Sequence, residues 1–474
     1  MGMKLIKGGT VVTATETMQA DVLIDGETVV GIASADHHNW GESTEVIDAT
    51  GKLVMPGGVD VHTHMELPFG GTYASDTFET GTRAAAFGGT TTIIDFAVQT
   101  FGNDVMPGFE EWMGKAEGNC AIDYGFHQII GDVTDSSLKE MEALIGEGVT
   151  SFKLFMAYPG VFYSDDGQIF RAMQKASEIG ATIMMHAENG MVIDVLRDQA
   201  VAKGQTDPVW HGITRPPITE GEATSRAIAI AELAGTPVYI VHLSAKEALD
   251  AVAAARNRGF NAFAETCPQY LYFSLEEHLD QDGFEGAKYV CSTPIRKRSE
   301  GHQDSLWKGL ATNDLQVVST DHCPFCFNDH PTMGTQKQLG VGDFRAIPNG
   351  LPAVENRYEL IYHGAMADGH LSLNRFVEVV ATTPSKMFGL YPKKGTIAVG
   401  SDADIVIFDP NTPHLISAET HHMNVDYSCW EGLSVAGSVQ TVLSRGRTII
   451  ADGEYHGKAG DGVYLRRGEN QYLI

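Results

Sequence analysis

The sequence predicts an α/β protein with a (β/α)8 barrel in its middle and a small β module built from both chain ends. Between about residues 56 and 390, apolar β-like runs alternate with helical patterns, which is typical of parallel α/β architecture. Short β-rich segments with Gly and Asp turns flank this region on both sides. The length of 474 residues also exceeds the usual size of one domain, so a second module is expected.

Both ends of the chain read as series of short strands. The N-terminal strands are expected at residues 5–6, 10–13, 21–24, 28–32 and 45–47, with a turn at 25–26. The C-terminal strands are expected at residues 395–397, 403–408, 439–444 and 447–451. We therefore expect residues 1–55 and 391–474 to form one β domain, and residues 56–390 to form the barrel domain.

The middle of the chain offers eight runs that could be barrel strands, at residues 53–60, 90–97, 121–130, 149–156, 181–186, 237–243, 261–265 and 315–320. Helical candidates lie between them at residues 78–87, 135–146, 169–179, 223–234, 245–258 and 300–311. Eight such units fit a barrel with insertions, and a doubly wound open sheet is the alternative. A Gly-x-Gly-x-x-Gly after the first strand and a Walker loop are both absent, so no nucleotide is indicated.

Composition and charge exclude several classes of partner. The 33 basic and 61 acidic residues give a formal charge of −28, which would repel nucleic acid and anionic membranes. Six cysteines are too few for a disulfide framework in a chain of this length. The sequence contains no signal-peptide pattern and no apolar run long enough to span a membrane. We expect a cytoplasmic protein that acts on a small molecule.

Reactive residues of a parallel barrel are expected at the carboxyl ends of its strands. The first expected strand leads into His62 and His64. Residues i and i+2 of an extended chain point to the same side, so both imidazoles can converge on one metal ion. A lone His-x-His pair is weak evidence, but this pair directly follows an apolar run and a Pro-Gly-Gly turn.

Lys153 lies inside the otherwise apolar fourth strand. A buried ammonium is costly, so this lysine needs a partner or a modification. One interpretation is a lysine whose head group reaches solvent at a strand end, and Lys153 alone would favour it. The other is a lysine carboxylated by CO₂, whose carbamate bridges two cations.

The remaining strand ends complete a potential ligand set. His186, His242 and Asp321 end or follow the fifth, sixth and eighth expected strands. Each histidine alone would more often be a satisfied core or loop residue, and Asp321 could simply cap the next segment. Six such residues at strand ends together predict a site for two metal ions.

Imidazole and carboxylate ligands without a thiolate pair suit zinc. His62, His64 and Asp321 would hold one ion, and His186 and His242 the other, with carboxylated Lys153 as the bridge. Both ions would keep an open position for a shared hydroxide, because bound zinc lowers the pKa of water towards neutrality.

The chain resembles the amidohydrolase superfamily, and more closely its dihydropyrimidinase/D-hydantoinase branch. The motifs that carry this resemblance extend through nearly the whole chain, at residues 56–64, 67–71, 81–90, 151–158, 320–323, 347–350 and 400–404. The resemblance implies a TIM barrel with a β-sandwich domain formed from both termini, and a homotetramer. It also identifies Lys153 with the carboxylated bridging lysine of the family, and the five other ligands with its metal-binding residues.

The resemblance further implies residues that bind the substrate. Tyr158 matches a tyrosine that contacts the substrate carbonyl and its developing oxyanion. Ser292 and Asn349 match positions whose backbone groups hydrogen-bond the ureide of the ring. Phe155 and Phe162 match an apolar gate around the exocyclic substituent.

The expected reaction is hydrolytic ring opening of cyclic ureides: 5,6-dihydrouracil and dihydrothymine to N-carbamoyl-β-amino acids, and also 5-substituted hydantoins. In this mechanism the hydroxide attacks the ring amide, and Asp321 serves as general base and then as general acid. Three alternatives remain: dihydroorotase, allantoinase and a non-catalytic scaffold of the collapsin-response type. Dihydroorotase has an arginine where this chain has Glu66, a residue expected to repel a carboxylated ring.

Overall fold

The structure, a computed structural model, describes residues 2–34 and 45–473. Its centre is an eight-stranded parallel sheet in the order β15-β14-β13-β12-β11-β10-β9-β6. The two edge strands approach each other through a parallel bridge between Thr63 and His322, and the His64 amide donates to the His322 carbonyl at 2.8 Å. The sheet is therefore a nearly closed barrel, and the predicted fold class is confirmed.

The barrel strands are β6 (Gly58–Thr63), β9 (Thr90–Val98), β10 (Asp123–Ile129), β11 (Ser151–Phe155), β12 (Thr182–His186), β13 (Val238–Ile240), β14 (Ala262–Thr266) and β15 (Val317–Val318). Every residue of these strands is buried. Parallel strands covered on both faces have continuous apolar sequences. For this reason, each of the seven strands from β9 to β15 falls inside its expected segment or extends beyond it by one residue.

The first expected strand, residues 53–60, is wrong as a single element. The chain forms β5 (Leu53–Pro56), which pairs with β1 (Met3–Val12) and β16 (Ile405–Asp409) of a second sheet, called here the terminal sheet because its strands come from both chain ends. The chain then forms β6, which pairs with β9 of the barrel. Gly57 joins the two, and a Cβ there would lie 2.2 Å from Thr91 Oγ1. The chain therefore passes from one sheet to the other at a residue that only glycine can occupy.

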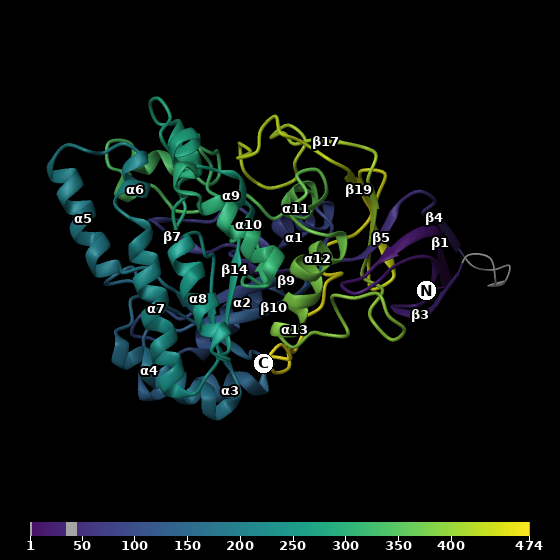
Figure 1. The fold of residues 1–474 in the computed structure, drawn as a ribbon, viewed down its shortest axis with the longest axis horizontal. Coiled ribbons are helices and arrows are strands. Elements are labelled where there is room, and N and C mark those ends of the chain that lie inside the picture. The colour runs from purple at the N-terminus through teal and green to yellow at the C-terminus, as the bar shows by residue number, and fades with distance from the viewer. Residues whose placement is uncertain (1, 35–44, 474) are drawn as a thin grey trace.

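Helices surround the barrel strands (Figure 1). The longer helices of the alternation are α1 (Phe78–Phe87), α2 (Met106–Ala116), α3 (Asp135–Gly146), α4 (Asp166–Ile179), α7 (Pro217–Ala234), α8 (Lys246–Asn257) and α10 (His302–Thr312). Capping boxes at Thr77, Thr134 and Asp165 begin α1, α3 and α4. No helix in the described part of the chain is long and apolar enough to cross a membrane.

Additional helices lie outside this simple alternation: α5 (Gly190–Ala202), α6 (Val209–Ile213), α9 (Pro268–Tyr272), α11 (Arg357–Met366), α12 (Leu373–Val377) and α13 (Thr383–Met387). The first two follow β12, and Figure 1 shows α5 at the end of the molecule opposite the terminal sheet. They belong to the insertions expected for a barrel of this length.

The second sheet contains strands from both ends of the chain, in the order β21-β20-β19-β16-β5-β1-β2-β3, with β4 paired to β1. Its further strands are β1 (Met3–Val12), β2 (Thr17–Asp25), β3 (Thr28–Ala33), β4 (Glu45–Asp48), β16 (Ile405–Asp409), β19 (Ser438–Ser444), β20 (Arg447–Ala451) and β21 (Glu454–Tyr455). The two expected strands at 5–6 and 10–13 are one strand, β1, interrupted by a register shift between Ile6 and Gly9. This sheet has its own hydrophobic core, which includes Val22 and Ile405.

Residues 395–397 do not form the expected strand. Gly395 has φ 79°, and a Cβ there would lie 2.5 Å from the carbonyl oxygen of Ala381. In place of the strand, the chain forms a turn at Gly395, and this turn packs against the preceding helical segment that contains Ala381. The end of the chain also leaves the terminal sheet, because the Leu465 amide donates to the Tyr124 carbonyl of the barrel. The domain boundaries at 55/56 and 390/391 stay a prediction.

Candidate active site

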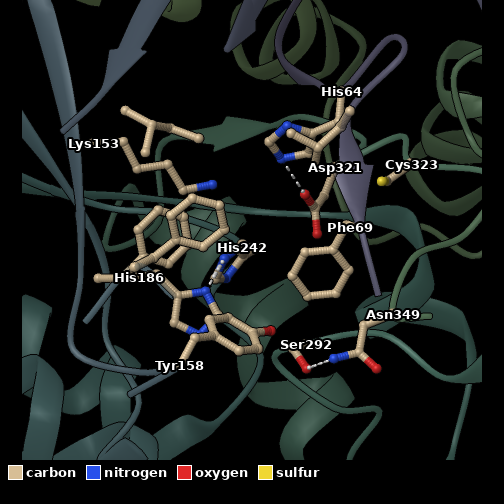
Figure 2. A pocket seen from close by; sticks show the side chains of 14 residues that line it. His64, Phe69, Lys153, Tyr158, His186, His242, Ser292, Asp321, Cys323 and Asn349 are labelled. Atoms are coloured by element: carbon tan, nitrogen blue, oxygen red, sulfur yellow. Dashed lines mark hydrogen bonds and ion pairs between the residues drawn. The ribbon is translucent and has the colours of Figure 1, made fainter. Parts of the chain in front are cut away.

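The predicted site residues converge at the carboxyl ends of the barrel strands (Figure 2). His62 and Lys153 lie on β6 and β11, His186 ends β12, and His242 and Asp321 follow β13 and β15. One cavity is lined by His64, Leu67, Phe69, Ile129, Lys153, Phe155, Tyr158, Phe162, His186, His242, Ser292, Asp321, Cys323 and Asn349. Of the predicted site residues, only the fully buried His62 lies behind this surface.

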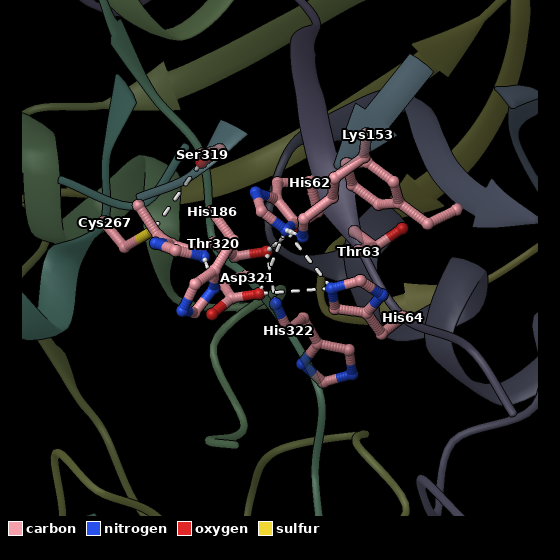
Figure 3. A network of polar contacts seen from close by, with 12 residues as sticks. His62, Thr63, His64, Lys153, His186, Cys267, Ser319, Thr320, Asp321 and His322 are labelled. Carbon is pink, nitrogen blue, oxygen red and sulfur yellow. Dashed lines mark hydrogen bonds and ion pairs between the residues drawn. The ribbon is translucent and has the colours of Figure 1, made fainter. Parts of the chain in front are cut away.

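His62, His64 and Asp321 form the first potential metal-binding group (Figure 3). The two histidine Nε2 atoms are 3.2 Å apart, and Asp321 Oδ1 lies 3.1 Å from that of His62 and 3.3 Å from that of His64. Burial would raise the pKa of Asp321, but the three nearby histidines hold it well below its usual range. An ionised carboxylate therefore faces two imidazole nitrogens.

His186 and His242 form a second group on the neighbouring strands. His186 Nδ1 lies 2.9 Å from His242 Nε2. Burial, with the proximity of His186, lowers the pKa of His242 well below its usual range, and burial also lowers those of His62 and His64. These three imidazoles are therefore neutral.

Two buried carboxylates that we did not predict contact the outer nitrogens of these histidines. Glu265 contacts His62 Nδ1, and Glu188 Oε2 lies 2.8 Å from His186 Nε2. A carboxylate on one imidazole nitrogen orients the other towards a metal ion. Both glutamates have a signal in the sequence, since Glu265 ends the seventh expected strand and Glu188 lies two residues after His186.

The donor set fits metal ions. In each group, imidazole nitrogens face one another or a carboxylate oxygen at hydrogen-bond distance, yet two lone pairs attract only when a proton or a cation lies between them. The buried Nδ1 atoms of His64 and His242 have no hydrogen-bond partner among residues 2–34 and 45–473. Nitrogen and carboxylate ligands of this kind suit zinc and related divalent metals.

Lys153 lies between the two histidine groups. Its Nζ is 2.9 Å from His62 Nε2 and 4.3 Å from the centre of the Phe96 ring. Burial lowers the pKa of Lys153 to about 8, although Asp321 and Glu265 act in the opposite direction. Lys153 is 2% exposed. Its head group therefore does not reach solvent, as it would if it were a lysine extending from a strand end.

The other end of the cavity is suited to a ring with polar edges. Burial raises the pKa of Tyr158, so its hydroxyl remains a hydrogen-bond donor. Asn349 Nδ2 donates to Ser292 Oγ at 3.1 Å. The rings of Phe155 and Phe162 stack with their centroids 5.0 Å apart, and both line the cavity as an apolar wall.

Strained backbone marks the same site. Tyr158, His242 and Asp321 have φ values of 61°, 40° and 52°. Left-handed conformations are unfavourable for these residue types and cluster at functional sites. The surrounding fold therefore holds each side chain in a direction that a relaxed chain would not favour.

Glu66 does not line the cavity. It is partly exposed, and its amide donates to the Asp76 carbonyl at 3.0 Å. The cavity lining therefore gives no support to the expected repulsion of a carboxylated ring by Glu66.

A nearly closed barrel with this site at its strand ends defines a hydrolase of the amidohydrolase type, a family that is generally metal-dependent. A family model described as "Amidohydrolase family" matches residues 218–449, and one described as "Dihydro-orotase-like" matches residues 51–248. Relatives that align with nearly the whole chain identify the family more narrowly.

The chain is 59% identical to a D-hydantoinase of Streptomyces coelicolor over 471 residues and 50% identical to a D-hydantoinase of Geobacillus stearothermophilus over 473 residues. These alignments cover at least 98% of each chain. The solved structure of a dihydropyrimidinase from Brevibacillus agri has a TM-score of 0.95 and 49% identity, over 98% of this chain and 99% of that one. The chain belongs to the D-hydantoinase/dihydropyrimidinase family, and it is a cyclic amide hydrolase.

Proposed function

We propose that the enzyme binds two zinc ions, one at His62, His64 and Asp321 and the other at His186 and His242. The single observation that carries this proposal is the presence of two facing groups of ligand atoms, each with a buried glutamate on an outer nitrogen. Bound zinc would supply a nucleophilic water at neutral pH and a Lewis acid for the amide carbonyl.

Lys153 is proposed to be carboxylated and to bridge the two ions. Its neutral amine would attack CO₂, form an N–C bond and lose one proton, which gives a carbamate anion. The pKa of about 8 supports this step because it leaves part of the amine unprotonated at neutral pH. The carbamate would replace a buried positive charge with a negative one, which suits two cations.

Tyr158 and Asp321 are proposed to act directly on the reacting amide. The Tyr158 hydroxyl would donate to the carbonyl oxygen as negative charge develops there. The Asp321 carboxylate would take a proton from the attacking water and deliver it to the departing ring nitrogen. Its lowered pKa supports this role because it keeps the group ionised before attack.

The proposed substrates are 5-substituted hydantoins and the dihydropyrimidines dihydrouracil and dihydrothymine. Backbone groups of Ser292 and Asn349 would hydrogen-bond the ureide, and Phe155 and Phe162 would surround the exocyclic substituent. We propose preference for the D enantiomer, because relatives named D-hydantoinase are 59% and 50% identical, whereas the structure of an L-hydantoinase from Arthrobacter aurescens is 29% identical.

A side-by-side hydrolysis assay on zinc-loaded enzyme tests this assignment. We expect turnover of D-5-substituted hydantoins and dihydrouracil, and little turnover of allantoin or dihydroorotate. Dominant hydrolysis of dihydroorotate or allantoin would contradict the substrate class. Absence of both bound metal and turnover would instead favour the non-catalytic scaffold.

We also propose a homotetramer, as the family resemblance implies. Met191, Val192 and Val195 on α5 are 57%, 45% and 55% exposed, and an apolar helix face of this kind is suited to contact between subunits. Light scattering of the purified enzyme should give four times the mass of the chain, and a monomer would contradict the proposal.

A further inference from the structure

Lys337 is a fully buried lysine that the mechanism above does not use. Its Nζ donates to three backbone carbonyls, those of Val290 at 3.0 Å, Pro348 at 2.8 Å and Gly350 at 2.9 Å. An ammonium group has three N–H donors, so these contacts satisfy it completely.

The three carbonyls belong to the two loops that carry Ser292 and Asn349. Val290 lies two residues before Ser292, and Pro348 and Gly350 flank Asn349. The loops also contact each other directly: the Gly350 amide donates to the Val290 carbonyl at 3.0 Å, and the Asn349 and Ser292 side chains are joined (Figure 2). Lys337 therefore binds at the junction of the two loops.

A charged group is required for this contact. Three carbonyl oxygens with partial negative charge converge on one point, and an apolar replacement would leave them buried without their donor. Burial lowers the pKa of Lys337 to about 8, so the ammonium form predominates at neutral pH. The nearby thiols of Cys291, Cys323 and Cys429 remain neutral because burial raises the pKa of each.

The junction has little room to move. A Cβ on Gly350 would lie 2.2 Å from the Cys323 carbonyl oxygen, and Cys323 follows Asp321 by two residues. A shift of the Asn349 loop would therefore change its distance from both Ser292 and the strand end that carries Asp321.

We propose that Lys337 is a positioning residue that fixes the two ring-binding loops relative to each other and thereby sets the affinity for the ureide ring. This inference rests on the proposed function, because it assumes that the Ser292 and Asn349 loops bind the ring. The three hydrogen bonds of Lys337 go to loop carbonyls and not to the proposed metal ligands, so its loss should affect KM more than kcat.

The test compares Lys337→Met with a matched control, Lys288→Met, in the zinc-loaded enzyme. Lys288 precedes the same loop, but its half-buried side chain pairs with Glu285 at 2.6 Å and lies over the Phe327 ring, away from the three loop carbonyls. For dihydrouracil we expect Lys337→Met to raise KM about tenfold, which corresponds to ~1.4 kcal/mol, with kcat and zinc content nearly unchanged. Lys288→Met should leave KM unchanged. If Lys337→Met does not fold, Lys337→Gln, which keeps one amide donor pair, replaces it and should give an intermediate KM.

A double-mutant cycle with Asn349→Ala separates positioning from general destabilisation, because coupled residues give non-additive effects. Asn349→Ala removes the side-chain link to Ser292 and should raise KM, and Lys337→Met should then add much less than tenfold. The inference would be overturned if Lys337→Met raised KM by the same factor in the parent enzyme and in Asn349→Ala. It would also be overturned if Asn349→Ala raised KM and Lys337→Met alone did not. Absence of dihydrouracil turnover in the parent enzyme would contradict the proposed function instead.

Discussion

Two buried lysines in different regions of the molecule have opposite surroundings. Lys394, at the junction of the barrel with the terminal sheet, places Nζ 2.5 Å from Asp123, 2.9 Å from Asp402 and 2.8 Å from Asp404. These carboxylates outweigh burial and raise its pKa. Lys153, in the barrel mouth, faces a neutral imidazole, and burial lowers its pKa to about 8.

The difference shows that the partners of a buried lysine, rather than its burial, indicate its role. An ammonium among carboxylates remains charged and joins structural elements. An amine beside neutral histidines, with its pKa lowered to about 8, has an enlarged unprotonated and nucleophilic fraction at neutral pH. We therefore expect Lys394 to contribute to stability and Lys153 to contribute to chemistry.

Replacement of Lys153 by Ala should have the largest effect. The variant would lose the bridge between the metal groups, so turnover and the tight binding of zinc should disappear together. The barrel should remain folded, because the strand that carries residue 153 keeps its backbone pairing with β10 and β12. Zinc analysis, a hydrolysis assay and circular dichroism of one preparation check this prediction. Full retained activity would end the proposed mechanism.

Replacement of Lys394 by Met should have the opposite profile. It would leave three carboxylates without their cation, and breaking a buried ion pair in this way costs about 3–5 kcal/mol. Denaturant unfolding measures the loss, and kcat of the folded fraction should be unchanged. Lys393→Met is the control, because that side chain is 63% exposed and should change the free energy of unfolding by less than ~0.5 kcal/mol. A normal stability for Lys394→Met would remove the contrast between the two lysines.

Replacement of Tyr158 by Phe removes a single oxygen from the barrel mouth. If the hydroxyl stabilises the developing oxyanion, kcat should fall about 10²–10³-fold. Zinc content and thermal stability should be close to those of the parent enzyme. A variant with parental kcat would place the oxyanion donor elsewhere.

Replacement of Glu265 by Gln should have the smallest of these effects. The carboxylate orients His62, and loss of such a partner lowers metal affinity about 10–100-fold. Competition with a chelator measures the affinity for zinc, with the exposed Glu285→Gln as the control. Equal affinities in both variants would show that Glu265 has only a structural role.

The sequence was sufficient to predict the barrel and to single out six ligand-type residues that the structure brings together, and their binding of metal stays a prediction. Their positions follow from one rule, that strand ends of a parallel barrel converge. Five of them lie at or just after the end of an apolar run, and Lys153 lies inside one. Tyr158, Ser292 and Asn349 came instead from family resemblance, because nothing in their local pattern distinguishes them from loop residues.

The remaining features depend on contacts between distant segments. The division of the first strand at Gly57 requires knowledge that Thr91 packs against it. The roles of Glu265 and Lys337 depend on partners 203 and 47 residues away in the chain. Hydrophobic periodicity indicates which face of a strand or helix is buried. It does not indicate which residues from distant segments pack against that face.

The most direct test of the two-metal site is a joint measurement of zinc content and lysine carboxylation. Enzyme prepared with ¹³C-labelled bicarbonate would be examined by metal analysis and by ¹³C NMR. The proposed two-metal site requires two zinc ions and one carbamate carbon per chain, with the carbamate signal absent in Lys153→Ala. Fully active enzyme without a carbamate signal, or with a single metal ion, would contradict it.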